Sequence, residues 1–363
     1  MIPVTVPFMP PLQEYQDKVR SIWDRAWLTN HGPLVNELEL QLKVHLGLQH
    51  LLYVSSGTMA LQLALRALNV EGEVITTPFS YVATASAISW DRSTPVMVDI
   101  QADTLNIDPD KIESAITDRT TAILAVHVYG NACNVERLET IAKNHRLRLI
   151  FDAAHAFGSL YKGKSLFAYG DVSTASFHAT KLFHTVEGGA VISPDPKVTR
   201  RLSLMRNFGH KSPTEFELAG INGKNSEFHA AMGLCNLRHV PSILVQRKAL
   251  SERYSTNLRG APVKHQILTE GCQYNYAYYP VIFESEALLL EIVETLNLHG
   301  IYPRRYFYPS LSSLPFLSDH QPTPVCDDIA CRVLCLPLYH TLSVEEVDMI
   351  SRLILRTLRY RNQ

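Results

Sequence analysis

The chain has 363 residues, which at about 150 residues per domain predicts two domains and excludes a small stapled scaffold. Its 46% hydrophobic and 19% charged residues are typical of a globular protein with a large buried core, which excludes disorder along the whole chain. Lys and Arg number 34 and Asp and Glu number 35, so a formal charge of −1 leaves no basic field for a nucleic-acid partner.

The six cysteines include no CxxC pair, so we expect reduced, mostly buried thiols in a cytosolic protein. The first residues show no basic stretch followed by an apolar run, and no apolar run approaches the roughly 18 residues that a membrane helix needs. We therefore expect neither a standard export signal nor a membrane span. No metal site is expected.

The first half of the chain alternates short apolar or β-branched runs with longer helical patterns. This alternation predicts an α/β fold with a mostly parallel central sheet flanked by helices. The expected helices cover Leu12–Leu28, Pro33 to near Gly47, Met59–Leu68 and Ala83–Trp90, with two more capped by Asp108 and Asn134. The expected strands cover Leu51–Val54, Glu73–Thr77, Pro95–Val98, Thr121–Val128 and Leu147–Phe151.

The second half begins with two strand-like runs and continues as a smaller α+β unit. We predict a large cofactor-binding domain with an N-terminal arm over residues 1–240 and a small C-terminal domain over residues 241–363. The expected elements are strands Val172–Phe177 and Gly189–Ile192, helices Ser226–Leu237 and Ile243–Leu258, strand Tyr276–Phe283, and helices Glu286–Leu298 and Val344–Leu358.

One segment matches a nucleotide-binding motif without its structural context. Residues Gly158 to Ser165 satisfy GxxxxGK[ST], the phosphate loop of ATPases. That loop requires a helix that begins at its Lys-Ser pair, because the free amides and dipole of the helix N-terminus hold the phosphates. The residues that follow have no helical period and include Gly170. We therefore predict a polar hairpin or loop instead of a triphosphate site.

A better candidate for an anion site lies between the Leu51–Val54 strand and the helix that follows it. Ser55-Ser56-Gly57-Thr58 offers hydroxyl donors and a glycine that lets backbone amides approach a ligand. A helix N-terminus there favours a phosphate by roughly 0.3–2 kcal/mol. Taken alone, the segment also fits a plain Ser/Thr helix cap.

An aspartate and a lysine are the other candidate functional residues. Asp152 ends the Leu147–Phe151 strand, at the sheet edge where open α/β folds bind ligands, and burying it is expensive without a cation. Its alternative role is a helix cap. Lys181 follows the Val172–Phe177 strand, and a lysine in a loop is ordinarily a solvated charge. The apolar strands on both sides of Lys181 weaken that alternative.

A phosphate cradle, a strand-end carboxylate and a partly buried lysine at one sheet edge are what pyridoxal phosphate requires of a protein. The lysine forms a Schiff base with the cofactor, and the carboxylate keeps the pyridine nitrogen protonated so that the ring accepts electrons. The helix end holds the phosphate. The combination is far more specific than any one of its parts.

Nearly the whole chain resembles the fold-type I sugar aminotransferases of the DegT/StrS family. Within that family the sequence is most similar to the VioA-type enzymes, which aminate dTDP-4-keto-6-deoxyglucose at C4. The matching segments are Trp27-Leu28-Thr29-Asn30-His31-Gly32-Pro33, Ser55-Ser56-Gly57-Thr58-Met59-Ala60-Leu61, Glu73-Val74-Ile75-Thr76-Thr77-Pro78, Tyr81-Val82-Ala83-Thr84-Ala85, His127-Val128-Tyr129-Gly130, Asp152-Ala153-Ala154-His155-Ala156 and Glu187-Gly188-Gly189.

The resemblance implies three catalytic residues, Lys181, Asp152 and His155, and an aromatic residue that binds the cofactor ring, Tyr81. It makes Lys181 the Schiff-base lysine and Asp152 the partner of the pyridine nitrogen. Tyr81 falls where the family stacks an aromatic ring on the cofactor. His155 falls where a Gln or His lies beside the ring and its phenolic oxygen.

The resemblance also implies a phosphate site that two subunits share. Gly57, Thr58 and Ser176 fall where the family binds the phosphate, and Asn222 and Lys224 fall on the loop that the neighbouring subunit contributes. We therefore expect a homodimer with shared sites. The family usually has Arg or Asn where Lys224 stands. Val186 replaces a frequent glycine before the Glu-Gly-Gly turn.

The implied reaction transfers an amino group from L-glutamate to a nucleotide-linked 4-keto-6-deoxyhexose through pyridoxal and pyridoxamine phosphate. A 3-keto-sugar or a UDP-linked substrate stays open as an alternative. The related sugar dehydratases carry His at the lysine position, so Lys181 argues against them, and a non-enzymatic regulator would have lost one of the three groups. Four cations are candidate hydrogen-bond donors to the diphosphate: Lys162, Lys164, Arg304 and Arg305. The alternative for each is an ordinary solvated charge on the surface.

Overall fold

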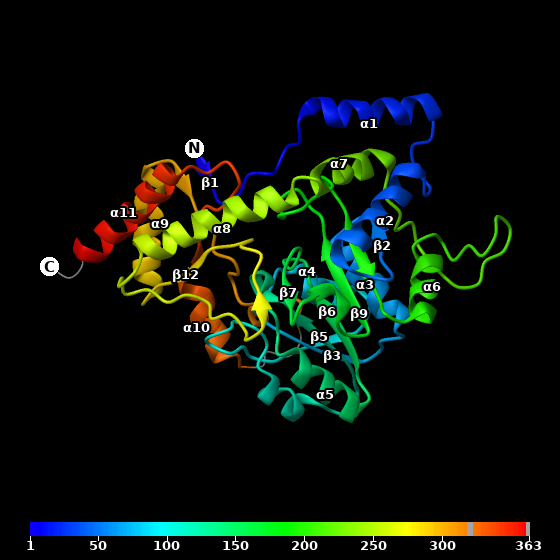
Figure 1. The fold of residues 1–363 in the computed structure, drawn as a ribbon. Helices are drawn as coiled ribbons and strands as arrows, with labels where there is room; N and C mark the ends of the chain where they lie inside the picture. The colour runs from blue at the N-terminus through cyan, green and yellow to red at the C-terminus, as the bar shows by residue number, and fades with distance from the viewer. Residues whose placement is uncertain (318–321, 361–363) are drawn as a thin grey trace.

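A seven-stranded sheet forms the centre of the molecule in the computed structural model, which describes residues 1–317 and 322–360 (Figure 1). Only β10 runs antiparallel to its neighbours β2 and β9 in this sheet, so the predicted mostly parallel sheet is confirmed. Its strands, in spatial order, are β2 (Leu52–Val54), β10 (Gly189–Ile192), β9 (Val172–Ser176), β6 (Arg148–Asp152), β5 (Thr120–Val126), β3 (Glu73–Thr76) and β4 (Thr94–Met97).

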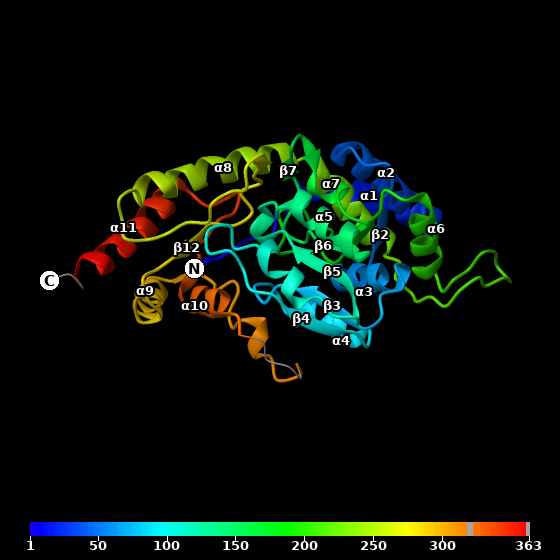
Figure 2. The ribbon, with the colours of Figure 1, turned by 90° about the horizontal axis from the view of Figure 1, so that it is seen from below.

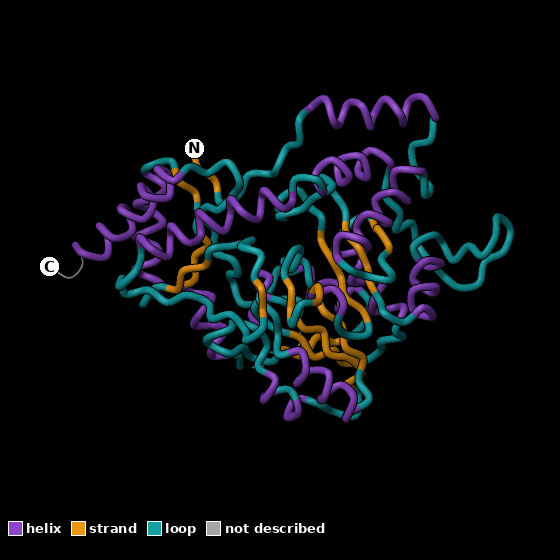
Figure 3. The backbone as a smooth tube through the Cα atoms, in the orientation of Figure 1, coloured by secondary structure: helices purple, strands orange, loops and turns teal. Residues whose placement is uncertain are grey.

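Helices cover both faces of this sheet, because the strands are apolar on both sides. Along β5, Ala122 and Leu124 pack into one core while Ile123 and Ala125 pack into the other, as the two-residue period of a strand dictates. Figure 3 shows the strands between the two helical layers. One layer contains α2 (Pro33–Leu46), α5 (Val135–His145) and α7 (Glu227–Leu237), and the other contains α3 (Gly57–Ala67), α4 (Ala83–Trp90) and α6 (Pro196–Met205).

A second hydrophobic core lies beyond the sheet and is built mainly from residues 250–358. Figure 2 shows α8 running from the sheet region to α11 at the far end. We propose a domain boundary near residue 240, where α8 begins. The elements of this part are α8 (Val240–Asn257), β12 (Pro280–Ile282), α9 (Glu286–Leu298), β13 (Ile301–Tyr302), α10 (Pro324–Arg332), β14 (Val333–Cys335) and α11 (Val344–Tyr360).

The N-terminal arm connects the two parts. Its first strand, β1 (Ile2–Pro3), pairs with β13, and the carbonyl of Phe8 accepts a hydrogen bond of 2.7 Å from Nε2 of His184. Helix α1 (Leu12–Arg25) follows and packs on α7 (Figure 1). The arm therefore reaches the loop that carries Lys181.

Some predicted elements differ in the structure. The prediction of an α-helix after Asp108 is wrong. Two 3₁₀ turns, Pro109–Lys111 and Glu113–Ala115, form there instead, because the backbone becomes extended at Ile116. Helices α6 and α10 were not predicted, and the strand expected over Tyr276–Phe283 is shortened to β12.

The GxxxxGK[ST] segment folds as the predicted hairpin. Its strands are β7 (Leu160–Tyr161) and β8 (Lys164–Ser165), and β11 (Cys272–Gln273) pairs with β7 as a third strand. No helix begins at Lys164, so the segment lacks the N-terminal amides that a phosphate loop uses. Among the helices of residues 1–317 and 322–360, none is long and apolar enough to cross a bilayer.

Candidate functional site

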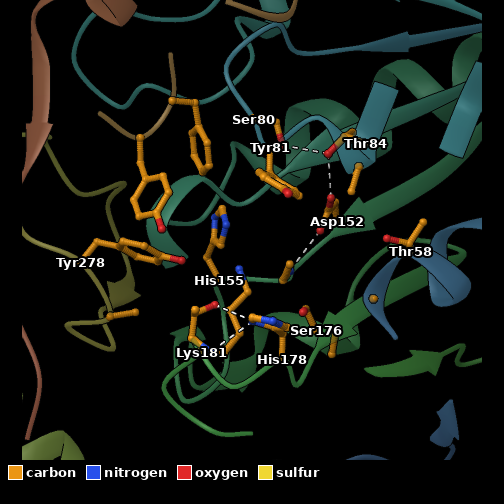
Figure 4. A pocket seen from close by; sticks show the side chains of 18 of the residues that line it. Thr58, Ser80, Tyr81, Thr84, Asp152, His155, Ser176, His178, Lys181 and Tyr278 are labelled. Atoms are coloured by element: carbon orange, nitrogen blue, oxygen red, sulfur yellow. Dashed lines mark hydrogen bonds between the residues drawn. The ribbon is translucent and has the colours of Figure 1, made fainter. Parts of the chain in front are cut away.

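A pocket of about 340 Å³ opens at the carboxyl ends of the central strands, between the sheet and the second core. In the view of Figure 4, Thr58 lies on one side of the pocket and Tyr278 on the other, with Asp152 and His155 between them. Parallel strands place ligands at this edge, as the sequence predicted for Asp152. Seven of the nine predicted site residues line the pocket: Gly57, Thr58, Tyr81, Asp152, His155, Ser176 and Lys181.

Asp152 is a buried carboxylate, with 6% of its surface exposed at the end of β6. Its Oδ2 accepts a hydrogen bond of 2.9 Å from the hydroxyl of Thr84, and its Oδ1 accepts one of 3.1 Å from the amide of Ala154. Burial raises the pKa of Asp152, and the two hydrogen bonds and the charge of Lys181 only partly oppose this rise. The pocket thus holds a carboxylate whose charge needs a cation.

Lys181 lies in the loop that connects β9 with β10. Backbone hydrogen bonds close this loop, from Phe177 N to Gly188 O at 2.8 Å and from Thr185 N to Phe177 O at 2.9 Å. Burial lowers the pKa of Lys181, and the negative charge of Asp152 is the largest influence that opposes the shift. A lowered pKa increases the fraction of the lysine that is the neutral, nucleophilic amine near neutral pH.

His155 is a neutral hydrogen-bond donor at the wall of the pocket. Its Nδ1 accepts the amide proton of Tyr129 at 3.3 Å, which leaves the ring proton on Nε2. Burial, together with the charge of Lys181, holds the pKa of His155 well below its ordinary value. Its ring stacks on Phe307 at a centroid distance of 5.4 Å, which fixes its plane.

The anion cradle forms where α3 begins against β9. Ser56 caps α3 by accepting a hydrogen bond of 3.1 Å from the amide of Met59, and the first helical hydrogen bond runs from Ala60 to Ser56. The amides of Gly57 and Thr58 therefore precede that bond and point out of the helix. A Cβ at residue 57 would lie 2.8 Å from the Cβ of Ser176, so this close contact requires glycine.

Two predicted residues lie elsewhere in this single chain. Asn222 is exposed, and Nζ of Lys224 donates a hydrogen bond of 2.8 Å to Asn207 and lies over the ring of Phe208. Neither lines the pocket. A second subunit would have to bring them to it.

Sequence reasoning missed several residues of the pocket. Thr84 is the second residue of α4 and follows Tyr81 by three positions, and the sequence pattern assigned no role to its hydroxyl. Val4 of the N-terminal arm and Tyr278 and Tyr306 of the second part also line the pocket. No local pattern marks these three residues, because only the packing of distant segments brings them together.

Comparison with known proteins agrees with this geometry. A model of the DegT/DnrJ/EryC1/StrS aminotransferase family matches residues 12–354. The chain belongs to this family. It is a pyridoxal-phosphate-dependent sugar aminotransferase with the fold of that family.

Curated relatives and solved structures match this aminotransferase along its length. It is 41% identical to a dTDP-4-amino-4,6-dideoxy-D-glucose transaminase of Escherichia coli, over 98% of each chain. A transaminase of the same name from Shigella dysenteriae is 39% identical over 96% of each chain. The structure of DesI, solved with its TDP-sugar product, has a TM-score of 0.94 and 33% identity, and covers 99% of this chain and 94% of that chain. Helicobacter pylori PseC, an aminotransferase of pseudaminic acid biosynthesis, has a TM-score of 0.91 and 27% identity, with 99% of each chain covered.

Proposed function

We propose that this aminotransferase transfers the amino group of L-glutamate to C4 of a nucleotide-linked 4-keto-6-deoxyhexose, foremost dTDP-4-keto-6-deoxyglucose. The observation that carries the proposal is the full-length similarity to dTDP-4-amino-4,6-dideoxy-D-glucose transaminases. GDP-perosamine synthases match at 31% identity or less, so we favour dTDP over GDP as the nucleotide of the substrate.

The cytoplasmic location stays a prediction from the cysteines, all six of which are free thiols.

The pocket fits pyridoxal phosphate. When bound, the cofactor supplies an aldehyde for covalent attachment and a ring that accepts electrons from an adjacent carbon. Asp152 is buried and makes no ion pair in the described part of the chain, which is unfavourable for a carboxylate. A protonated ring nitrogen would supply the missing positive charge. The glycine-dependent contact of α3 with Ser176 leaves amides and hydroxyls for a phosphate.

We assign the covalent and proton-transfer steps to Lys181. With the cofactor bound, Nζ of Lys181 would hold it covalently, and once the amino donor had taken that place, the free amine would carry the proton that leaves the donor's α-carbon. The lowered pKa of Lys181 suits both tasks, because each needs a neutral amine. The same atom returns a proton to the sugar carbon in the second half of the reaction.

The other pocket residues hold and orient the cofactor in this proposal. Asp152 keeps the ring nitrogen protonated, and Thr84 fixes the carboxylate. The Nε2–H of His155 donates to the phenolic oxygen, and Tyr81, whose side chain is 60% exposed over the pocket, covers the ring. The phosphate is bound by the amides of Gly57 and Thr58 and by the hydroxyls of Thr58 and Ser176.

We propose a homodimer that completes this site with Asn222 and Lys224 of the second subunit. Large apolar side chains on α1 and α2 support an interface in that region: Trp23 is 68% exposed and Val44 is 76% exposed. Burying such side chains against a second copy would stabilise the dimer at roughly 25 cal/mol per Å² of apolar surface.

The decisive experiment is an incubation of the protein with pyridoxal phosphate, L-glutamate and dTDP-4-keto-6-deoxyglucose, followed by mass and NMR analysis. The proposal expects a 4-amino sugar and an equal amount of 2-oxoglutarate. Parallel reactions contain the 3-keto isomer, the UDP-linked sugar or the GDP-linked sugar. Conversion of one of these in place of the dTDP-4-keto sugar would overturn the substrate assignment, and loss of water without amine formation would indicate a dehydratase.

A further inference from the structure

Arg304 stands on the pocket wall that the second part of the chain provides. It follows β13 by two residues, and two backbone hydrogen bonds hold it to β14: Arg304 N to Cys335 O at 3.1 Å and Cys335 N to Arg304 O at 2.8 Å. The side chain therefore extends from a fixed point of the fold. It lines the same pocket as Lys181 and Asp152.

Arg304 differs from the other cations that the sequence offered as anion donors. Lys162 is paired with Glu136, and Lys164 is exposed on the β7–β8 hairpin outside the pocket. Arg305 is also engaged, because its Nη2 lies 2.6 Å from Glu286 Oε1 and its guanidinium lies 3.5 Å from the ring centroid of Tyr308. Within residues 1–317 and 322–360, no carboxylate lies within 4.0 Å of the Arg304 guanidinium.

The Arg304 side chain is exposed, and it shares the pocket wall with Tyr306. Burial raises the pKa of Tyr306, which lines the pocket, and the positive charges of Arg304 and Lys181 oppose that rise. The proposed phosphate site of the cofactor is formed by α3 and Ser176, so Arg304 is left free for a different anion. Guanidinium groups bind carboxylates and phosphates through two parallel hydrogen bonds.

We propose that Arg304 binds an oxyanion of the substrate in the pocket, either a carboxylate of the amino donor or the diphosphate of the nucleotide sugar. This assignment rests on the proposed function, in which both substrates are anionic and use one pocket in turn. It makes Arg304 a specificity residue: donors without a matching carboxylate, or sugars without the diphosphate, lose this contact. Chemistry at Lys181 would continue without it, at a raised substrate concentration.

Calorimetric titration of the cofactor-loaded protein separates the two sources of the anion. One arm uses dTDP, and the other uses glutarate, a dicarboxylate that has no amine and cannot react. We expect Arg304→Gln to weaken at least one of them about ten- to hundredfold, the range of a charged hydrogen-bonded contact, and Arg304→Lys to recover part of the loss. Lys164→Gln removes the same unit charge outside the pocket and should leave both affinities within about twofold.

The outcomes decide both the proposal and its source. Weaker binding of dTDP alone assigns Arg304 to the diphosphate, weaker binding of glutarate alone assigns it to the donor, and weakening of both assigns it to each substrate in turn. Unchanged affinities in Arg304→Gln, or no binding of either ligand to the wild-type protein, would overturn the proposal. Because these titrations need no turnover, a failure to form the amino sugar counts against the proposed function alone.

The first half-reaction provides a second readout. With L-glutamate as donor, Arg304→Gln should raise the KM and leave kcat nearly unchanged if the contact is made equally in the ground state and the transition state. A purely structural role would lower the thermal stability of the variant and move neither the KM nor the affinity for glutarate selectively. Arg304→Lys should bring the KM back toward the wild-type value.

Discussion

The hydroxyl of Thr84 donates a hydrogen bond of 2.9 Å to Oδ2 of Asp152, and it lies 2.8 Å from the hydroxyl of Ser80. Asp152 ends a central strand, whereas Thr84 lies in the first turn of α4 and Ser80 precedes that helix, so the contact joins the sheet to the helix beside it. It orients a carboxylate that makes no ion pair within 4.0 Å among the described residues, although the charge of Lys181 acts on it. This arrangement fits the role proposed for Asp152, in which the carboxylate would face a positively charged ring nitrogen.

Asp152→Asn should keep the fold and lose at least about 99% of the transaminase activity. Removing one member of a buried charge pair costs about 3–5 kcal/mol, and about 1.4 kcal/mol corresponds to a tenfold change in rate. Activity with glutamate and the dTDP-4-keto sugar, measured at saturating pyridoxal phosphate, checks this. Near-normal turnover would show that Asp152 only caps the residues after β6.

The apoprotein offers an independent test of the same carboxylate. Because burial raises the pKa of Asp152 above the ordinary value of 3.8, in the window just above pH 3.8 the folded chain still holds a proton that the unfolded chain has released. Stability therefore falls as pH rises through this window, and the ionised group destabilises the apoprotein above it. We expect apo Asp152→Asn to melt at or above the wild-type temperature at pH 7, and to gain less from added pyridoxal phosphate. A lower melting temperature of the apo variant contradicts this.

His155→Gln should retain activity within about twofold, whereas His155→Leu should lose activity by about two- to tenfold. Glutamine replaces the Nε2–H donor and leucine does not, and one such hydrogen bond contributes about 0.5–1.5 kcal/mol. Since the pKa of His155 lies well below its ordinary value, the pH–rate profiles of the wild type and His155→Gln should have the same acid limb. An inflection that only the glutamine variant lacks would assign a proton transfer to His155.

Val186→Gly should raise the free energy of unfolding by about 1 kcal/mol. Val186 has a φ of 67°, a left-handed conformation that costs a β-branched residue about 1–3 kcal/mol. Glycine avoids this strain but loses more chain entropy on folding, which offsets about 0.5–1 kcal/mol of the gain. Its side chain is 44% exposed, so little packing is lost. Denaturant unfolding of the apoprotein measures the change, with Val186→Ala as the comparison that keeps a Cβ. Destabilisation by glycine would mean that the valine side chain contributes more than its strain.

Co-expression of Lys181→Ala with the Asn222→Ala/Lys224→Ala double variant should restore roughly a quarter of the wild-type activity. Random pairing makes half of the dimers mixed, and each mixed dimer has one site with both Lys181 and an intact partner loop. Activity of the purified mixture is compared with that of each variant alone. No recovery in mixed dimers, or an active monomer in sedimentation, would refute the shared site.

Local sequence patterns predicted the parts of the site that directly follow a strand. The Ser55–Thr58 segment, Asp152 and Lys181 each follow or flank a recognisable strand, so their meeting at one sheet edge follows from parallel topology. The N-terminal arm and Arg304 could not be placed in this way. They reach the pocket through pairing of β1 with β13 and of Arg304 with Cys335, contacts between segments far apart in the chain.

Short 3₁₀ turns and the left-handed Val186 were also beyond local reasoning. A capping Asp108 and a proline after it predict where a helical turn begins, and the structure confirms the cap, from Asp110 N to Asp108 Oδ1 at 3.2 Å. They do not predict how far the helix continues, because packing of the following residues decides its length. The strain at Val186 depends on the loop closed around Lys181.

The most direct test of the central claim is borohydride reduction of the protein loaded with pyridoxal phosphate, followed by peptide mapping. Reduction makes the bond between the cofactor and its lysine permanent, so the modified peptide identifies the residue. The account predicts one modified lysine, Lys181, and loss of the label in Lys181→Ala. A label on another lysine, Lys164 of the β7–β8 hairpin included, would contradict it.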